Sequence, residues 1–195
     1  MIAFDFFFAI AAGFLVGSIM FSQILPQRVL GTDIAAVSDD HNPGATNVFI
    51  NCGTGLGLIC LALDIAKGFI PVLLACRYLD TENMLFGLVL AAPVLGHAIA
   101  PLHHFHGGKC IATSFGVLLG LIPVNQVVIV LAVLYILFST VLKIQSTRIR
   151  SIVTFSLFGL ISAAVLIVAG DYSIALGCGL IAVTAIVKHS KPFCN

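Results

Sequence analysis

The hydrophobic positions of this chain form long uninterrupted runs separated by short polar gaps. The runs cover roughly residues 2–24, 48–76, 84–102, 111–124, 127–142, 151–169 and 173–187. Because apolar residues are continuous within each run rather than alternating, the pattern favours helices over the strands of a transmembrane β-barrel. A membrane-spanning helix needs about 20 apolar residues. The run 111–124 is shorter, which leaves a half-helix as the alternative to a full span.

Composition assigns these helices to a membrane. Of the 195 residues, 60% are hydrophobic and only 9% are charged, whereas soluble domains average about 45–50% apolar and about 25% charged residues. Such a chain cannot cover itself with polar surface, so lipid must be part of its solvent. We therefore expect an all-α integral membrane protein with one multi-pass domain over 1–195, a compact bundle of about seven transmembrane helices.

The positions of the cations predict the topology. Because cytoplasmic segments are enriched in Lys and Arg, the N-terminus is expected outside and the C-terminus in the cytoplasm. The net charge of only +1 gives no basis for a nucleic-acid partner. Seven of the nine Lys and Arg residues lie in alternate gaps or in the tail: Arg28, Lys109, Lys143, Arg148, Arg150, Lys188 and Lys191.

Two glycine-bearing loops lie among these cations and are candidate phosphate sites. The first is Asn42-Pro43-Gly44-Ala45-Thr46-Asn47, which is expected to open the second span. Glycine allows close backbone approach, a helix N-terminus attracts anions, and Asn42, Gly44, Thr46 and Asn47 are the candidate binding residues. The alternative is an ordinary helix start, capped by Thr or Asn.

The second loop is Gly107-Gly108-Lys109, before the short fourth run. Lysine is a suitable point charge for phosphate, although the spacing of a Walker loop is absent. A lysine that extends to the membrane edge is the alternative. Two such loops on one side of the membrane strengthen the hypothesis of an anionic substrate.

The remaining polar residues within the runs have competing interpretations. Asp64 and Lys67 have the spacing of an ion pair on one helix face, so they either hold the bundle together or face substrate. His97 or His189 could act as a general base. The histidines at 97, 103, 104 and 106 lack further metal-ligand spacing, so neither a metal nor another cofactor is predicted.

Two soluble acyl-transfer signatures, a GxSxG elbow and an HxxxxD motif, are absent from the sequence. Several short motifs nevertheless resemble, in order, those of the bacterial acyl-phosphate:glycerol-3-phosphate acyltransferases, the PlsY family. They are Gly17-Ser18-Ile19, Asp33-Ile34, Asn42 to Val48, Leu63-Asp64-Ile65-Ala66-Lys67-Gly68, Gly96-His97 and Phe105 to Thr113.

The resemblance implies a multi-pass protein of the bacterial inner membrane with seven helices. It implies acyl phosphate and glycerol 3-phosphate as substrates, membrane lipid as surroundings, and lysophosphatidic acid as product for phospholipid synthesis. By the same resemblance Lys109 and His189 are the catalytic candidates. The phosphate-binding residues would be Asn42, Gly44, Thr46, Asn47, Gly107, Gly108, Lys109 and Ser146.

The sequence departs from the family pattern beside the first loop. Ser38-Asp39-Asp40-His41 replaces a shorter Gly-Ser-Gly segment, and two added carboxylates should repel phosphate. The alternatives to the acyltransferase are a non-catalytic or degraded membrane protein of the same fold that binds lipid or partners, and a small transporter. A transporter would be expected to have paired broken helices in two matching halves.

Overall fold

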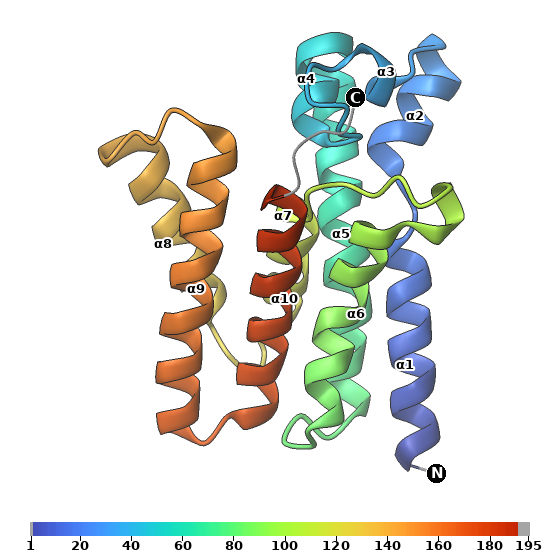
Figure 1. Cartoon of the computed structure of the whole chain (residues 1–195). Coiled ribbons are helices and arrows are strands. Elements are labelled where there is room, and N and C mark those ends of the chain that lie inside the picture. The colour runs from blue at the N-terminus through green and yellow to red at the C-terminus, as the bar shows by residue number, and fades with distance from the viewer. Residues whose placement is uncertain (1, 191–195) are drawn as a thin grey trace.

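The computed structural model describes residues 2–190, and within this range every regular element is helical. Figure 1 shows an upright bundle in which α1 begins at one end and α10 ends towards the other. The elements are α1 (Ile2–Gly17), α2 (Phe21–Leu30), α3 (Ile34–Val37), α4 (Ala45–Cys52), α5 (Thr54–Tyr78), α6 (Leu85–Ile99), the 3-10 turn η1 (Pro101–His103), α7 (Ile111–Gly120), α8 (Val128–Ile136), the π-helical turn η2 (Leu137–Val141), α9 (Thr147–Ala169) and α10 (Tyr172–Ser190).

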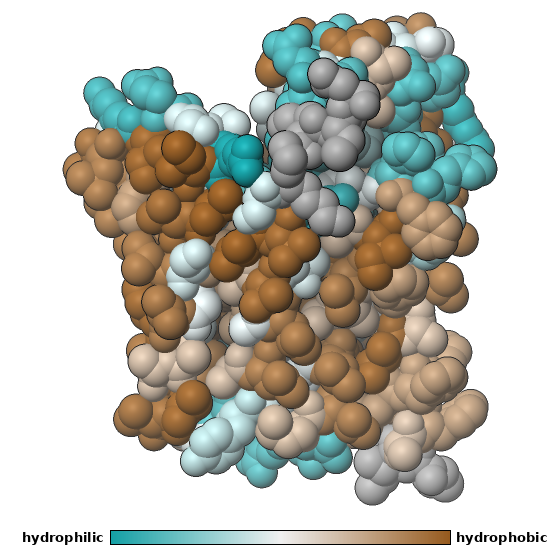
Figure 2. Space-filling view, in the orientation of Figure 1, coloured by the Kyte–Doolittle hydropathy of each residue, from teal (hydrophilic) through white to brown (hydrophobic). Residues whose placement is uncertain are grey.

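The lengths and the surface of these helices are those of an integral membrane protein. Figure 2 shows an apolar belt between two hydrophilic ends, and outward-facing side chains such as Phe4 and Val168 are 71% and 90% exposed. Exposure of so large an apolar surface to water is unfavourable, whereas lipid solvates it well. Within residues 2–190, five segments are long and apolar enough to span a membrane: Ala3–Leu30, Thr54–Tyr78, Leu85–His103, Thr147–Ala169 and Tyr172–Ser190.

Two further apolar segments are shorter than a span. They are Ile111–Gly120 and Val128–Val141, and they correspond to the fourth and fifth apolar runs of the sequence. Helix α7 has only ten residues, or about 15 Å of rise. The half-helix alternative for 111–124 therefore describes the observed element better than a full span.

The first two apolar runs are each divided, which the hydrophobic pattern did not predict. The chain turns between Gly17 and Phe21, so that α1 and α2 are separate helices. The second run divides at Gly53, whose φ of 87° ends α4 before α5 begins. The prediction that residues 42–47 open the second span is therefore wrong, because they open the short helix α4.

Helices α5 and α7 pack unusually closely, and glycine makes this possible. A Cβ on Gly116 would lie 2.0 Å from the carbonyl oxygen of Ile65, and one on Gly68 would lie 2.5 Å from that of Thr113. No side chain fits in these contacts. Gly116 and Gly120 have the spacing of a GxxxG motif, in which small residues allow two helices to approach closely.

Helix α6 forms the centre of the bundle, between α1 and α10. Most of its side chains are buried, including Phe86 and Leu90. On the side of α1, a Cβ at Gly96 would lie 2.0 Å from the Phe14 carbonyl oxygen. This tight core fixes the end of α6, from which the loop at residues 100–110 continues.

The segments that carry most cations lie at one end of the molecule. In the upper part of Figure 1 are α2 to α4, the loop after α6, the loop between η2 and α9, and the end of α10. The turns between α5 and α6 and between α9 and α10 lie at the opposite end. Loops far apart in sequence thus meet on one side of the apolar belt.

Candidate functional site

A cavity of about 470 Å³ lies where these loops converge. Its walls come from the loops before α4 and α7 and from helices α4 to α10. The polar and charged residues that line it are Asp40, Asn42, Thr46, Asn47, Asp64, His97, Lys109, Tyr135, Thr147, Arg150, Ser151 and His189. The cavity also has an apolar wall, to which α5 and α7 contribute Leu61, Ile65, Ile111 and Phe115.

The first predicted phosphate loop forms one wall of this cavity. Asn42, Gly44, Thr46 and Asn47 all line it. Gly44 is the N-cap of α4, and no side chain caps this helix, so the alternative of a cap by Thr or Asn is wrong. The Asn47 N–H already donates to the Gly44 carbonyl at 2.9 Å. The N–H groups of Ala45 and Thr46 precede the first hydrogen bonds of the helix, and at the cavity wall they offer donors to an anion.

Lys109 brings the second predicted loop to the first. Its Nζ lies 2.5 Å from Oδ2 of Asp40, with the two side chains 17% and 33% exposed. Burial alone would raise the pKa of the Asp40 carboxyl, but hydrogen bonds from Lys109 and Asn47 lower that pKa below its ordinary value. Asp40 is therefore an anion in the cavity, held by a cation 69 residues further along the chain.

Gly107 and Gly108 do not line the cavity. They allow the loop to pack against the end of α6, because a Cβ on Gly107 would lie 2.1 Å from the Ala98 carbonyl oxygen. Gly108 donates its N–H to the carbonyl of His97 at 3.1 Å. Lys188 of α10 donates to the carbonyls of Ala98 and Gly107, both at 3.0 Å. These contacts fix the loop that carries Lys109.

Two buried histidines contribute to the cavity lining. His97 and His189 are each 4% exposed, and the His189 ring lies close to the backbone of Lys109. Among the described residues, neither ring nitrogen of His189 has a partner in good hydrogen-bond geometry, and nor does Nδ1 of His97. Each ring can therefore exchange a proton or a hydrogen bond with a ligand.

Ser146 is not brought into the cavity. It is exposed and caps α9, where its Oγ accepts the N–H of Ile149 at 3.3 Å. The following residues Thr147 and Arg150 do line the cavity. From the sequence, Arg150 indicates only topology, because a cation at the start of an apolar run carries no signal that separates substrate contact from membrane orientation.

Asp64 and Lys67 form a structural pair that borders the site. Lys67 Nζ lies 2.8 Å from Asp64 Oδ1 and donates to the Ile19 carbonyl at 2.6 Å. Ser22 donates to the other carboxylate oxygen at 2.5 Å. The pair connects α5 to the segment between α1 and α2 and to the start of α2. It therefore holds the bundle together, as one of the two alternatives predicted. Asp64 also contributes to the cavity wall.

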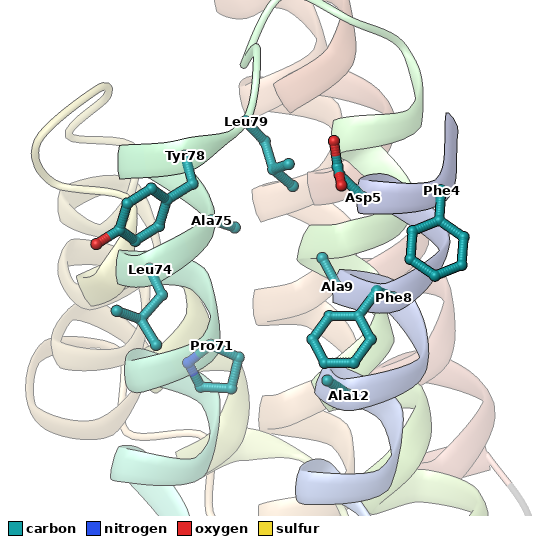
Figure 3. Close-up of a pocket in the computed structure, with 10 residues that line it drawn as sticks. All are labelled: Phe4, Asp5, Phe8, Ala9, Ala12, Pro71, Leu74, Ala75, Tyr78 and Leu79. Carbon is teal, nitrogen blue, oxygen red and sulfur yellow. The ribbon is translucent and has the colours of Figure 1, made fainter. Parts of the chain in front are cut away.

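A second cavity, of about 570 Å³, lies elsewhere, between α1 and α5. Figure 3 shows its lining side chains, which are mostly apolar and include Phe4, Phe8 and Leu74 with the carboxylate of Asp5 at one edge. No cation lines it, so it lacks the donors that a phosphate needs. As for metals, no group of three potential ligands among His, Cys, Asp and Glu occurs within residues 2–190.

The fold and the site together define a class: a helical membrane protein with a cavity that combines cations and polar side chains with an apolar wall. A family model described as "Glycerol-3-phosphate acyltransferase" matches residues 7–194. The chain belongs to the glycerol-3-phosphate acyltransferase family.

Individual relatives agree with this assignment. A glycerol-3-phosphate acyltransferase of Hydrogenobaculum sp. (strain Y04AAS1) is 34% identical over 181 residues, which are 91% of this chain and 86% of the relative. One of Legionella pneumophila subsp. pneumophila is 32% identical over 188 residues, 96% of this chain and 65% of the relative. Neither relative gives support to the non-catalytic alternative.

Two similar solved structures are crystal structures of PlsY (YgiH), an integral membrane glycerol 3-phosphate acyltransferase. The glycerol 3-phosphate form has a TM-score of 0.80 at 28% identity, and the comparison covers 95% of this chain and 88% of that chain. The lysophosphatidic acid form has a TM-score of 0.78 at 27% identity, with the same coverage. The chain is thus a multi-pass integral membrane protein with the architecture of this family.

Proposed function

We propose that the chain transfers an acyl group from acyl phosphate to a hydroxyl of glycerol 3-phosphate, giving lysophosphatidic acid and inorganic phosphate. The single observation that carries the proposal is the position of Lys109 beside the N-terminus of α4, in a cavity that also has an apolar wall. Membership of the glycerol-3-phosphate acyltransferase family supports the same reaction.

Each substrate carries a phosphate group, and acyl phosphate also carries an acyl chain. The cavity has one surface that suits phosphate and another that suits the chain. Lys109, Arg150 and the first N–H groups of α4 offer positive charge and donors to phosphate. The apolar wall from α5 and α7 suits an acyl chain. We assign Asn42, Gly44, Thr46 and Asn47 to the phosphate wall, and Gly107 and Gly108 to positioning Lys109. Ser146 positions α9 and thereby Thr147 and Arg150.

The chemistry needs no covalent enzyme intermediate, because acyl phosphate is an activated mixed anhydride. The glycerol hydroxyl oxygen attacks the acyl carbonyl carbon, and the bond from that carbon to the phosphate oxygen breaks. We assign His189 to orient the hydroxyl and accept its proton, while Lys109 offsets the negative charge that develops on the leaving phosphate. Most of the rate enhancement then comes from positioning and electrostatics.

We also propose that the cavity faces the cytoplasm of a bacterial cell, with the protein in the inner membrane. The seven passes through the membrane would be α1 with α2, α5, α6, the short helix α7, α8 with η2, α9 and α10, with the N-terminus outside and the C-terminus inside. Of these, α7 and α8 with η2 are shorter than a full span. The clustering of cations at the end that holds the cavity supports this orientation. Water-soluble glycerol 3-phosphate would then enter from the cytoplasm.

An assay of purified protein in lipid nanodiscs tests the reaction. The wild-type chain is expected to convert acyl phosphate and labelled glycerol 3-phosphate into lysophosphatidic acid. Lys109→Ala should reduce kcat/KM by about 10²–10³-fold, the usual effect of removing one donor to a developing anion. Arg77→Ala is the matched control, because Arg77 is an exposed cation in the last turn of α5 and does not line the cavity.

If the wild-type chain produces no lysophosphatidic acid with any acyl phosphate offered, the proposed reaction is wrong. If Lys109→Ala and Arg77→Ala reduced kcat/KM equally, the result would instead contradict the position of the phosphate site.

A further inference from the structure

The carboxylate of Asp40 lies where a bound anion would be expected. Its Oδ2 accepts from Lys109 Nζ at 2.5 Å, and its Oδ1 accepts from Asn47 Nδ2 at 2.7 Å. The backbone N–H of Asn42 donates to the same Oδ1 at 3.3 Å. One carboxylate thus uses three donors: one from the loop before α4, one from the first turn of α4 and one from the loop before α7.

These donors are among those assigned above to phosphate. A carboxylate and a phosphate have the same sign of charge and accept the same kinds of hydrogen bond. They cannot share a cation at contact distance without strong repulsion. Phosphate therefore competes with the Asp40 side chain for the hydrogen bonds of Lys109 and Asn47.

Asp40 has room to make this exchange. Its side chain is 33% exposed, and it belongs to the turn between α3 and α4, outside the apolar spans. The backbone of this turn has its own contacts: the His41 N–H donates to the Ser38 carbonyl at 3.1 Å, and the His41 ring contacts the Ala35 carbonyl at 2.9 Å. A rotation about the Asp40 side-chain bonds can therefore end its contact with Lys109, while these two contacts of the turn do not involve the Asp40 side chain.

We propose that Asp40 is a tethered competitor of the substrate phosphate, so that it sets how tightly the site binds phosphate monoesters. In the empty site it holds Lys109 and Asn47, and a phosphate dianion must displace it in order to bind. The proposal deepens the function proposed above and rests on it for the identity of the phosphate ligand. It makes Asp40 a determinant of affinity, acting through Lys109.

The test compares Asp40→Asn with Asp39→Asn in nanodiscs. Both variants remove one carboxylate from the same turn, but Asp39 is exposed and does not line the cavity. Asp40→Asn should lower the Kd for inorganic phosphate, measured by calorimetry, and the KM for glycerol 3-phosphate by about tenfold each, the equivalent of one charge-assisted hydrogen bond. Asp39→Asn should leave both values within about twofold of wild type, because exposed charges are screened.

An unchanged or raised Kd for phosphate in Asp40→Asn overturns the proposal. An equal decrease of this Kd in Asp39→Asn also overturns it. If phosphate binding tightens as expected while the wild-type chain makes no lysophosphatidic acid, the competitor role stands and the proposed reaction fails. A thermal readout is also available: Asp40→Asn should lower the unfolding temperature of the empty protein more than that of the phosphate-saturated protein. Should Asp40→Asn not fold, Asp40→Ser keeps an oxygen acceptor for Asn42 without the charge and is subject to the same comparisons.

Discussion

Asp40 is held as an anion by neighbours that prefer its charged form. Its burial opposes ionisation, but the hydrogen bonds from Lys109 and Asn47 prevail and lower its pKa. A group whose pKa is lower in the folded than in the unfolded chain stabilises the fold at pH values above the unfolded pKa. This contribution is lost as the pH falls through the lower, folded pKa.

The stability difference between wild type and Asp40→Asn should therefore depend on pH. We expect it to stay constant from about pH 8 to about pH 5 and to shrink below the ordinary carboxyl value of 3.8. Thermal unfolding of both proteins in detergent, monitored by circular dichroism, measures this difference. A difference that already vanished near pH 6 would show that the carboxyl is not held as an anion.

Many residues of the site are predictable from the sequence, but the contacts between them are not. Six of the predicted site residues line the observed cavity: Asn42, Gly44, Thr46, Asn47, Lys109 and His189. The sequence predicted that Asp40 would repel phosphate, but not that it would pair with Lys109, because no local pattern encodes a contact across 69 residues. Gly107 and Gly108 have a packing role that depends on where α6 ends.

At the scale of elements, the packing of α5 against α7 sets the apolar wall of the site. Gly116→Ala would introduce a methyl group 2.0 Å from the Ile65 carbonyl oxygen, and the backbone would have to move. We expect a loss of about 1–3 kcal/mol in the free energy of unfolding, as for other overpacked cores. Denaturation in detergent measures it.

Gly179→Ala is the matched control for this substitution. Gly179 lies in α10, where an added Cβ would meet no atom within 4 Å. The free energy of unfolding of the Gly179→Ala protein should therefore be unchanged or raised by up to about 1 kcal/mol. Equal stability of the Gly116→Ala and Gly179→Ala proteins would contradict the close α5–α7 contact.

The hydrophobic pattern predicted helices well and their breaks poorly. All seven apolar runs contain helices, because a continuous apolar run in lipid has few other ways to satisfy its backbone. The breaks at residues 18–20 and at Gly53 interrupt runs that remain apolar on both sides. The first break is bridged by Lys67, which donates to the Ile19 carbonyl, and such a tertiary contact has no signature in hydropathy.

At the scale of the whole molecule, the fold brings four separated polar segments to one end of an apolar belt. The cations that predict orientation and the donors that line the cavity are partly the same residues, Lys109 and Arg150 among them. Topology and chemistry are therefore linked. An enzyme that draws one substrate from the lipid and another from the cytoplasm needs its charged cavity at this boundary.

Labelling of an introduced thiol tests this central claim most directly. In a cysteine-free background, Thr147→Cys puts a thiol at the exposed edge of the cavity, and Asp80→Cys puts one at the opposite end of the molecule. An impermeant maleimide should label position 147 only in inverted vesicles and more slowly when glycerol 3-phosphate is present. Position 80 should be labelled only from outside, at a rate that glycerol 3-phosphate does not change. Labelling of position 147 from outside, or at the same rate with and without glycerol 3-phosphate, would contradict a cytoplasmic cavity that binds this substrate.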